Sequence, residues 1–349
     1  MKKLSWFDKL IFFLNSLLAI ALIVAYFLPY IPPKSYPLIS VLTLGVPILI
    51  IANLVFFLYW LLRMKRQMVL SLLIMIIGFG FASKFYKWPF TGEDGAGQYS
   101  IMNYNVRMFN KSVWTEEENI PEKINAIIDE ADPDILTIEE YYKNEYLEKK
   151  YPFKFIKYRS ERSSFGQAIF SKFPLIGKTS LDFNVDDFTG DNNNAIFTDV
   201  IIEEDTIRLY NIHFQSLKVT EDIQEVDNFK DKQESKKVVK NISSGFVRQQ
   251  NQAEKVYQSI RESAYPVIIS GDFNNTAFSH TYKHVRNDRF QDAFVKKGAG
   301  FSSTYNLNYF PLRIDFHLLD TVFEINSYER IKVPYSDHYP ILTTFSFKN

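Results

Sequence analysis

The chain has 349 residues, 40 lysines and arginines against 40 aspartates and glutamates, and no cysteine. Disulfide bonds therefore add nothing to its stability, and cysteine usage does not indicate a redox compartment. Charge is uneven along the chain: from Gly95 onward 31 basic residues face 37 acidic ones, so composition gives no sign of the basic face with which proteins usually grip nucleic acid non-specifically.

The first ninety residues are dominated by three apolar stretches, at about residues 10–30, 38–62 and 68–83. The first two are long enough to cross a bilayer as helices, whereas the third needs its flanking residues to reach that length. Core helices of a soluble domain would be shorter, and a cleaved signal peptide would not be followed by two more apolar stretches. Residues 1–90 are therefore predicted to be a multi-pass membrane segment with three transmembrane helices.

Basic residues predict the orientation of these helices, because cytoplasmic loops carry an excess of Lys and Arg. They gather before the first stretch and between the second and third, at Lys2, Lys3, Lys9, Arg63, Lys65 and Arg66. Three crossings then place the rest of the chain outside the cytoplasmic membrane. Lys84 and Lys87 argue mildly for the opposite, and the orientation reverses if the third stretch does not span. The stretches contain no Asp, Glu, Lys or Arg, so an anchor is favoured over a transporter or sensor.

Residues 91–98 form a short, Gly-rich polar stretch that is typical of a linker. Residues 99–349 have the length of one domain. Within them, residues 217–245 are dense in mixed charge and poor in large apolar side chains, which predicts a partly helical surface insertion. Such insertions usually have no role of their own, but this one follows His213 directly, so a flap that faces the substrate is the alternative.

Six short motifs in residues 99–349 place metal- or phosphate-binding groups mostly at the ends of strand-like stretches. Asp, Glu, Asn and His are the groups that bind a hard divalent cation and polarise a phosphate. In chain order they are Asn105, Glu140, His213 with Asn211, Asp272 with Asn274, Asp315, and Asp337 with His338. Strand ends can converge on one rim of a sheet while remaining far apart in sequence, so the pattern predicts a catalytic rim.

The motifs read, in order, Asn-Val-Arg, Pro-Asp-Ile-Leu with a following Glu, Asn-x-His, Gly-Asp-Phe-Asn, Arg-Ile-Asp and Ser-Asp-His. This series resembles the endonuclease/exonuclease/phosphatase superfamily, which includes pancreatic deoxyribonuclease, abasic-site endonucleases, inositol polyphosphate 5-phosphatases and neutral sphingomyelinases. Residues 166–174 look like a strand of that family, and Arg248 with Gln252 looks like its Arg-x-x-x-Gln helix. The resemblance covers residues 99–349. It implies a four-layered α/β sandwich, two mixed β-sheets flanked by helices, after the N-terminal transmembrane segment.

The resemblance also implies a metal site. Glu140 matches the family's main metal ligand, Asp337 is a second ligand, and Asn105 would support the metal or hold a neighbouring ligand. The family's usual Gln before this Glu is Glu139 here. Its carboxylate either points away from the metal or adds negative charge near it, and strand alternation favours the first. Arg107 stands where some nucleases have an acidic ligand, which leaves one or two metals open.

The Gly-Asp-Phe-Asn motif carries the attack on phosphorus. Asp272 and Asn274 lie two residues apart and so on the same side of an extended chain. By resemblance, Asp272 orients or deprotonates the attacking water, and Asn274 hydrogen-bonds the phosphate. A Gly-Asp pair alone would indicate a turn or cap, but within the full set catalysis is favoured.

The histidines of the motifs are expected to act on the phosphate and on the leaving oxygen. By resemblance, His338 contacts the phosphate as a cation, and Asp315 holds its ring and raises its pKa. His213, with Asn211 at the substrate, could protonate the leaving oxygen. Three histidines belong to no motif and are expected to be surface or packing residues: His280, His284 and His317.

These residues predict a membrane-anchored phosphoesterase that uses Mg²⁺, with Mn²⁺ as a substitute, to direct water at a phosphodiester or phosphomonoester. Family frequency favours nucleic acid, hence a nuclease-like enzyme. Membrane proximity favours a lipid, sugar or inositol phosphate, with a sphingomyelinase-like activity as the alternative. A non-catalytic module that binds phosphorylated ligands is a further alternative, although it would not need the full set of residues. Beyond the lipid bilayer, no protein partner is predicted.

Overall fold

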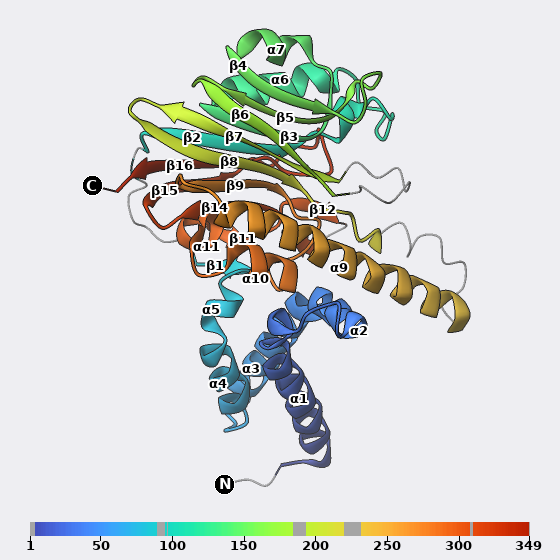
Figure 1. The fold of residues 1–349 in the computed structure, drawn as a ribbon. Coiled ribbons are helices and arrows are strands. Elements are labelled where there is room, and N and C mark those ends of the chain that lie inside the picture. The colour runs from blue at the N-terminus through green and yellow to red at the C-terminus, as the bar shows by residue number, and fades with distance from the viewer. Residues whose placement is uncertain are drawn as a thin grey trace. The chain divides into compact units, whose positions relative to one another are not determined.

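The computed structural model describes residues 4–88, 95, 97–183, 193–219, 232–307 and 310–348. The chain forms two compact units (Figure 1). We call the first the helical unit; it comprises Met1–Tyr86, Leu217–Gln250 and Thr276–Lys283. The second, the sheet unit, comprises Lys87–Ser216, Asn251–Asn275 and His284–Asn349. Most of the predicted linker at residues 91–98 lies outside the described residues.

The N-terminal part of the helical unit is a series of apolar helices. They are α1 (Trp6–Ala25), η1 (Leu28–Tyr30), α2 (Pro37–Val41), η2 (Leu42–Gly45), α3 (Val46–Leu62), α4 (Met68–Ile77) and α5 (Phe79–Ala82). Two stretches, Trp6–Tyr30 and Pro37–Leu62, are long and apolar enough to cross a membrane, whereas the third apolar helix, α4, has only 10 residues. A glycine, Gly78, separates α4 from α5, and a side chain there would collide with the ring of Tyr26.

Two ends of this helix bundle can be told apart by their contacts. Arg63, just after α3, lies 3.0 Å from Asp8 near the start of α1. At the other end of α1, the hydroxyl of Tyr26 donates to the carbonyl of Ile74 in α4. The start of α1 and the basic residues 63–66 are therefore at one end, and residues 26–45 and 78–85 are at the other.

Two later segments of the chain pack on that second end, within the helical unit. Ile242 and Phe246 of α9 (Lys232–Arg261) contact the apolar residues Val41 and Leu44. Phe278 packs into the cluster formed by α1 and α3–α5. Both segments fall within residues 99–349, which the sequence assigns to one domain, and the helical part of α9 agrees with the partly helical insertion predicted at residues 217–245. Residues 220–231 of that insertion lie outside the described residues.

The sheet unit contains two six-stranded mixed sheets, as the sequence predicts. One has the order β10-β14-β9-β8-β7-β6 and the other β15-β16-β2-β3-β5-β4. Within each, one pair of neighbours is parallel, β8 with β9 and β2 with β3, and the other pairs are antiparallel. The strands of the first sheet are β6 (Leu175–Asp182), β7 (Asn194–Ile202), β8 (Asp205–His213), β9 (Val267–Asp272), β10 (Phe290–Asp292) and β14 (Asp315–Asp320). Those of the second are β2 (Tyr99–Asn105), β3 (Ile135–Tyr142), β4 (Phe153–Tyr158), β5 (Phe165–Ser171), β15 (Phe323–Arg330) and β16 (Ile341–Phe347).

Alternation along the strands builds two apolar layers. In β3, Ile135 faces the other sheet, where it joins a cluster with Leu209 and Ile268, whereas Leu136 faces outward against helix α6. Helix α6 (Ile120–Ala131) buries every fourth residue, which is the apolar face of an amphipathic helix. Figure 1 shows α6 and α7 (Glu145–Lys150) on the outer face of the second sheet. The fold is thus the predicted α/β sandwich.

The short elements of the sheet unit lie around these sheets. They are β1 (Tyr86–Lys87), η3 (Arg107–Asn110), α10 (His280–Arg286), α11 (Ala293–Lys297), β11 (Gly300–Phe301), β12 (Tyr305–Leu307) and β13 (Phe310–Leu312). β12 and β13 pair antiparallel, and helix α10 begins in the helical unit.

Candidate active site at the strand ends

Strand pairing lines up three of the predicted residues across the first sheet. β8 and β9 are parallel and end together, so that His213 lies opposite Asp272. β14 is antiparallel to β9 and begins where β9 ends, which places Asp315 on the other side of Asp272. In the second sheet, β2 and β3 are also parallel, and their pairing places Asn105 of β2 opposite Glu139 of β3. The predicted rim is therefore formed by the ends of strands that are distant in sequence.

Asp272 is fixed by the residues on both sides of it. Gly271 has φ +140°, and a side chain there would meet the backbone of Ile212 in β8, so only glycine lets β9 pass this close. After Asp272, Asn274 adopts a left-handed conformation with φ +49°. Its backbone N–H donates to Oδ1 of Asp272 at 2.7 Å, and its side-chain amide donates to Oδ2 at 3.1 Å. The Gly-Asp-Phe-Asn motif is thus one rigid turn that holds a carboxylate.

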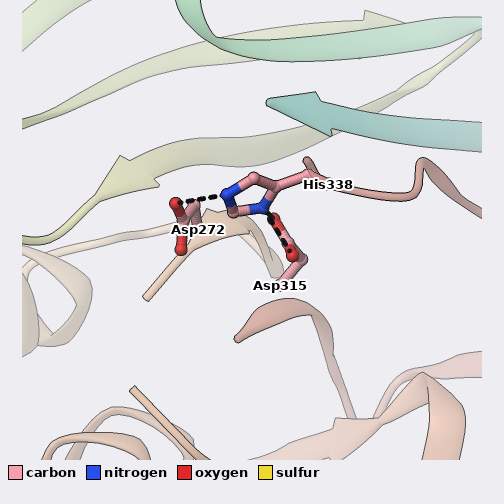
Figure 2. Close-up of side chains that lie close together, drawn as sticks. All are labelled: Asp272, Asp315 and His338. Carbon is pink, nitrogen blue, oxygen red and sulfur yellow. Dashed lines mark hydrogen bonds and ion pairs between the residues drawn. The ribbon is translucent and has the colours of Figure 1, made fainter. Parts of the chain in front are cut away.

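His338 lies between two carboxylates, as Figure 2 shows. Its Nδ1 is 3.0 Å from Oδ2 of Asp315, and its Nε2 is 3.8 Å from Oδ2 of Asp272. All three side chains are buried. Burial by itself would lower the pKa of His338, but the charges of Asp315 and Asp272 outweigh it and raise that pKa well above the usual value. This shift of the pKa favours the cationic form of the imidazole, which is the form that the resemblance implies.

The same surroundings shift the ionisation of the neighbouring groups. Burial raises the pKa of Asp272 to about 8, against the opposing charge of His338. His213, with Nε2 at 3.8 Å from Oδ2 of Asp272, behaves in the opposite way, because burial and the cationic His338 lower its pKa to about 3. One imidazole of the rim is thus charged near neutral pH and the other is neutral.

The two adjacent glutamates do not alternate as predicted. Pairing of β3 with β5 shifts register between Ile138 and Tyr141, and Glu140 has φ +47°. This bulge breaks the two-residue period at Glu140. Glu139 itself continues the set of Ile135 and Thr137 that faces the other sheet, and so points toward the site. It is fully buried and lies within electrostatic reach of Asp315, Asp272 and His338. Burial is the main reason that its pKa is raised well above the usual value, while the nearby side chain of Asn103 acts in the opposite direction. Neither carboxyl oxygen has a partner of normal hydrogen-bond geometry among the described residues.

Glu140 lies beside the other predicted metal ligands. Burial raises its pKa, and the charge of Asp337 raises it further, while Arg107 and the amide of Asn105 act in the opposite direction. Asn105 also donates to Oδ2 of Asp272 at 3.1 Å, so this amide joins the Glu140 side of the site to the Asp272 side. Glu140 and Asp337 are two partly exposed, mutually repelling carboxylates that supply the oxygen ligands a hard divalent cation prefers, and these residues fit such an ion.

A second group also has the geometry of a cation site. Ligand atoms of Asp272, Asp315 and His338 lie within 4.8 Å of one another. However, Nδ1 of His338 is already engaged by Asp315 at 3.0 Å, and its Nε2 is 3.8 Å from Oδ2 of Asp272. We therefore favour the position at Glu140 and Asp337 for a metal.

Asn211 is not among the residues brought to the rim. It is fully buried, and its side-chain amide donates to the carbonyls of Ile138 and Ala168 at 3.0 Å each. Both carbonyls belong to the opposite sheet, so this side chain links the two sheets beneath His213. Its predicted contact with the substrate would require both of these bonds to be given up.

Several residues near the site were not predicted from the sequence. The hydroxyl of Ser336 donates to the carbonyl of Asn105 at 2.7 Å and so joins the last motif to the first. The ring of Tyr305 lies edge-on to His338 with centroids 5.0 Å apart. Trp114 lies against the guanidinium of Arg107. Of these residues, only Ser336 could have been found from the sequence, because it belongs to the Ser-Asp-His motif. Tyr305 and Trp114 belong to no sequence motif.

Two histidines outside the motifs lie away from the rim or beneath it. His284 is 2.8 Å from a carboxylate oxygen of Glu254. His317 is buried, with Nδ1 at 2.8 Å from the hydroxyl of Thr343, and burial lowers its pKa to about 3. Both have packing surroundings, as expected from the sequence.

Comparison with known proteins identifies the family. A family model described as Endonuclease/Exonuclease/phosphatase family matches residues 102–338, and a model for a domain of unknown function matches residues 8–85. None of the curated proteins matches the chain.

Solved structures share the fold at low identity. An endonuclease/exonuclease/phosphatase from Bacteroides vulgatus has 16% identity and a TM-score of 0.55, covering 72% of this chain and 99% of that one. D. rerio TDP2 complexed with a single-strand DNA product has 17% identity and a TM-score of 0.52 (71% and 98% covered). A mannosyl-6-phosphatase from Bacteroides thetaiotaomicron VPI-5482 has 15% identity and a TM-score of 0.51 (72% and 100% covered). With the family model matched from the first motif to the last, the chain belongs to the Endonuclease/Exonuclease/phosphatase family of hydrolases that act on phosphate esters with divalent metals.

Proposed function

We propose that this protein is a Mg²⁺-dependent phosphoesterase, able to use Mn²⁺, that is anchored in a membrane by its N-terminal helices. The observation that carries the proposal is the buried set Asp315–His338–Asp272, joined through Asn105 to the carboxylates of Glu140 and Asp337. Burying so much like charge is costly unless it is used to bind a cation and an anionic substrate. A structural role alone would not require it.

Glu140 and Asp337, with Asn105 in support, hold the metal in this proposal. A divalent cation bound there would act as a Lewis acid on a phosphate oxygen. His338, kept cationic by Asp315 and Asp272, binds a second phosphate oxygen. Its charge is present before the substrate arrives, which is the preorganisation that makes such groups effective.

Asp272 is the proposed base for the attacking water. Its carboxylate is oriented by Asn274, and burial raises its pKa, which makes it a stronger proton acceptor than an exposed aspartate. The amide of Asn274 donates to Asp272 and to the carbonyl of Phe214, so in this proposal it turns to the phosphate only when one of these bonds is released. His213 is neutral, because its pKa is lowered to about 3, so in this proposal it stabilises the leaving oxygen through an N–H hydrogen bond rather than as an imidazolium acid.

The membrane proposal rests on α1 and on the α2–α3 stretch, which have the length and composition of spans. The basic residues 63–66 lie at the end of the bundle near Asp8, whereas Phe278 and Phe246 pack on the opposite end. This is the arrangement expected if α4 and α5 complete a third crossing and the catalytic residues lie outside the cytoplasmic membrane. A phosphatase fused after Asn349 should then be active and a fluorescent protein fused there dark. The reverse pattern contradicts this topology.

The substrate class is best approached with a panel. Nucleic acid is the first candidate, since one structural relative holds a DNA product, and sugar, inositol or lipid phosphates are the second, since another is a sugar phosphatase. The full chain in detergent, with Mg²⁺, should hydrolyse at least one of plasmid DNA, mannose 6-phosphate, inositol phosphates and sphingomyelin. EDTA and Glu140→Gln should each abolish that activity. Activity that survives both contradicts the metal-dependent reaction, and binding without hydrolysis favours a phospho-ligand binding module.

A further inference from the structure

A run of strained residues follows the first motif, directly beside the proposed metal site. Non-glycine residues rarely adopt a left-handed conformation, because Cβ then crowds the following carbonyl. Here four adopt it in succession: Arg107 (φ 44°), Met108 (φ 55°), Phe109 (φ 52°) and Asn110 (φ 64°). Strain of this kind persists only where its surroundings enforce it, and it concentrates at functional sites.

The surroundings do enforce it. The backbone N–H of Arg107 donates to Oδ1 of Asn105 at 3.1 Å. The side chain of Asn110 closes a loop by donating to the carbonyl of Thr115 at 2.9 Å and accepting from its N–H at 3.2 Å. Phe109 is buried, with its ring edge-on to Tyr141. The turn is therefore fixed at both ends and in the middle.

This turn holds the guanidinium of Arg107 in one place. Nη1 of Arg107 lies 2.5 Å from Oδ2 of Asp337, and the Trp114 ring, which the closed loop brings back, lies 4.8 Å from the guanidinium carbon. The side chain remains 36% exposed. Among the residues that the structure describes, Nε and Nη2 of Arg107 have no hydrogen-bond partner. Through this ion pair with Asp337, the guanidinium adjoins the proposed metal site.

Counting phosphate oxygens shows what such a guanidinium would select. A phosphodiester has two non-ester oxygens, and in the proposed function the metal takes one while His338 and Asn274 take the other. A phosphomonoester has a third, and near neutral pH it carries most of a second negative charge. Arginine presents its donors as a planar fork that matches such an anion.

Building on the proposed function, we propose that Arg107 is a specificity-determining residue that binds the third oxygen of a terminal phosphate, so that this enzyme prefers phosphomonoesters to phosphodiesters. In the reaction, the water oxygen forms a bond to phosphorus and the bond from phosphorus to the ester oxygen breaks. One water proton goes to Asp272, and the leaving oxygen takes up a proton, giving an alcohol and inorganic phosphate.

The test compares two matched substrates on the full chain with Mg²⁺. Wild type should hydrolyse p-nitrophenyl phosphate with a kcat/KM at least about tenfold above that for bis(p-nitrophenyl) phosphate. Arg107→Gln should lower the monoester value by about 10- to 100-fold, the range of a charged hydrogen bond, and change the diester value by less than about threefold. Arg107→Lys keeps the charge without the fork and should fall between the two. Lys111→Gln, an exposed cation four residues on, is the control and should leave the ratio unchanged.

Binding of inorganic phosphate gives a readout that does not depend on turnover. Its affinity, measured by calorimetry, should fall in Arg107→Gln by about the same factor as the monoester kcat/KM. If wild type hydrolyses no ester but Arg107→Gln still weakens phosphate binding, the catalytic function fails and the role of Arg107 stands. If phosphate affinity is unchanged, or both substrates slow equally, or wild type prefers the diester, the role of Arg107 is wrong.

The origin of the terminal phosphate is resolved by a second set of substrates. Mannose 6-phosphate, vesicles with phosphatidic acid and a 5′-phosphorylated oligonucleotide offer the same group on a sugar, a lipid and a nucleic acid. Release of phosphate from any of them supports the proposal, and the fastest identifies the source. Faster internal cleavage of the unphosphorylated oligonucleotide overturns it.

Discussion

The helical unit exposes many large apolar side chains, whereas the sheet unit buries most of its own. In the N-terminal helices, Asn15 and Ser71 are completely buried and hydrogen-bonded to each other at 2.7 Å, while Phe13 and Ile48 are 59% and 57% exposed. In the sheet unit, the apolar clusters are inside. Exposed apolar rings and buried polar contacts are what a lipid solvent requires of a helix bundle, so the inversion supports the proposed anchor.

Buried polar groups also differ between the units in how completely they are paired. Asn15 accepts from Trp60 as well as donating to Ser71, which is sufficient to join helices. At the catalytic rim, Glu139 is buried with no partner for either carboxyl oxygen among the described residues. Buried polar side chains therefore join helices in the helical unit. At the catalytic rim of the sheet unit, the buried carboxylates are instead available for the proposed chemistry.

The largest expected effect separates chemistry from packing at the rim. Asp272→Asn and His338→Ala should each lower turnover by about a hundredfold or more, the scale of positioned acid–base and electrostatic groups. Substrate affinity should change much less in Asp272→Asn, since water activation matters mainly in the transition state. Steady-state kinetics of the full chain on its best substrate measures both, with His284→Ala as control. Near-normal turnover in both variants would refute the catalytic assignment.

The next effect tests whether the two units face different solvents. Ile48→Arg places a charge on an exposed position near the middle of an apolar stretch and should cost about 2.5–3.5 kcal/mol of insertion free energy. Val322→Arg replaces a residue of similar type in the sheet unit, 43% exposed, and should change stability by no more than about 0.5 kcal/mol. Membrane fractionation of both variants measures the difference. Equal membrane recovery of Ile48→Arg and wild type would contradict the anchor.

A smaller effect should depend on pH. Because the folded-state pKa of Glu139 lies above its unfolded value, the native state binds the extra proton, and stability falls as pH rises above the unfolded pKa of about 4.5. Glu139→Gln removes this penalty and should stabilise the metal-free protein by about 1–3 kcal/mol, with a larger gain at pH 8 than at pH 5. Thermal unfolding in EDTA at both values checks this. A loss of stability at pH 8 would show that the carboxylate has a partner.

The smallest effect concerns the polar contacts between the helices. Asn15→Leu removes the bonds to Ser71 and Trp60 and should destabilise the bundle by only about 0.6 kcal/mol, the average for such contacts between membrane helices. Unfolding of the full chain in detergent measures it, with the exposed Leu17→Ala as control. A loss of several kcal/mol would mean that the unit behaves as a water-soluble core.

The sequence by itself determined the chemistry of the site and the existence of the apolar helices. Strand ends occupied by Asn105, Asp272 and Asp315 could be recognised because alternation and terminal polar residues are local patterns. The lengths of α1 and α3 follow in the same way from runs of apolar residues. Residue identity and local periodicity are the same in the sequence and in the fold, because neither depends on which distant segment packs beside them.

Only the tertiary structure decided how individual side chains are oriented and which of the two units each segment belongs to. A bulge at Glu140 shifted the register of β3 against β5, so that Glu139 and Glu140 both lie within electrostatic reach of His338, and register is set by the partner strand. The side-chain amide of Asn211 donates hydrogen bonds to carbonyls of the opposite sheet. The segment after Asn274 belongs to the helical unit, where Phe278 packs against the helices. Each outcome depends on contacts between residues far apart in the chain, and a local pattern holds no information about the partner that such a contact will find.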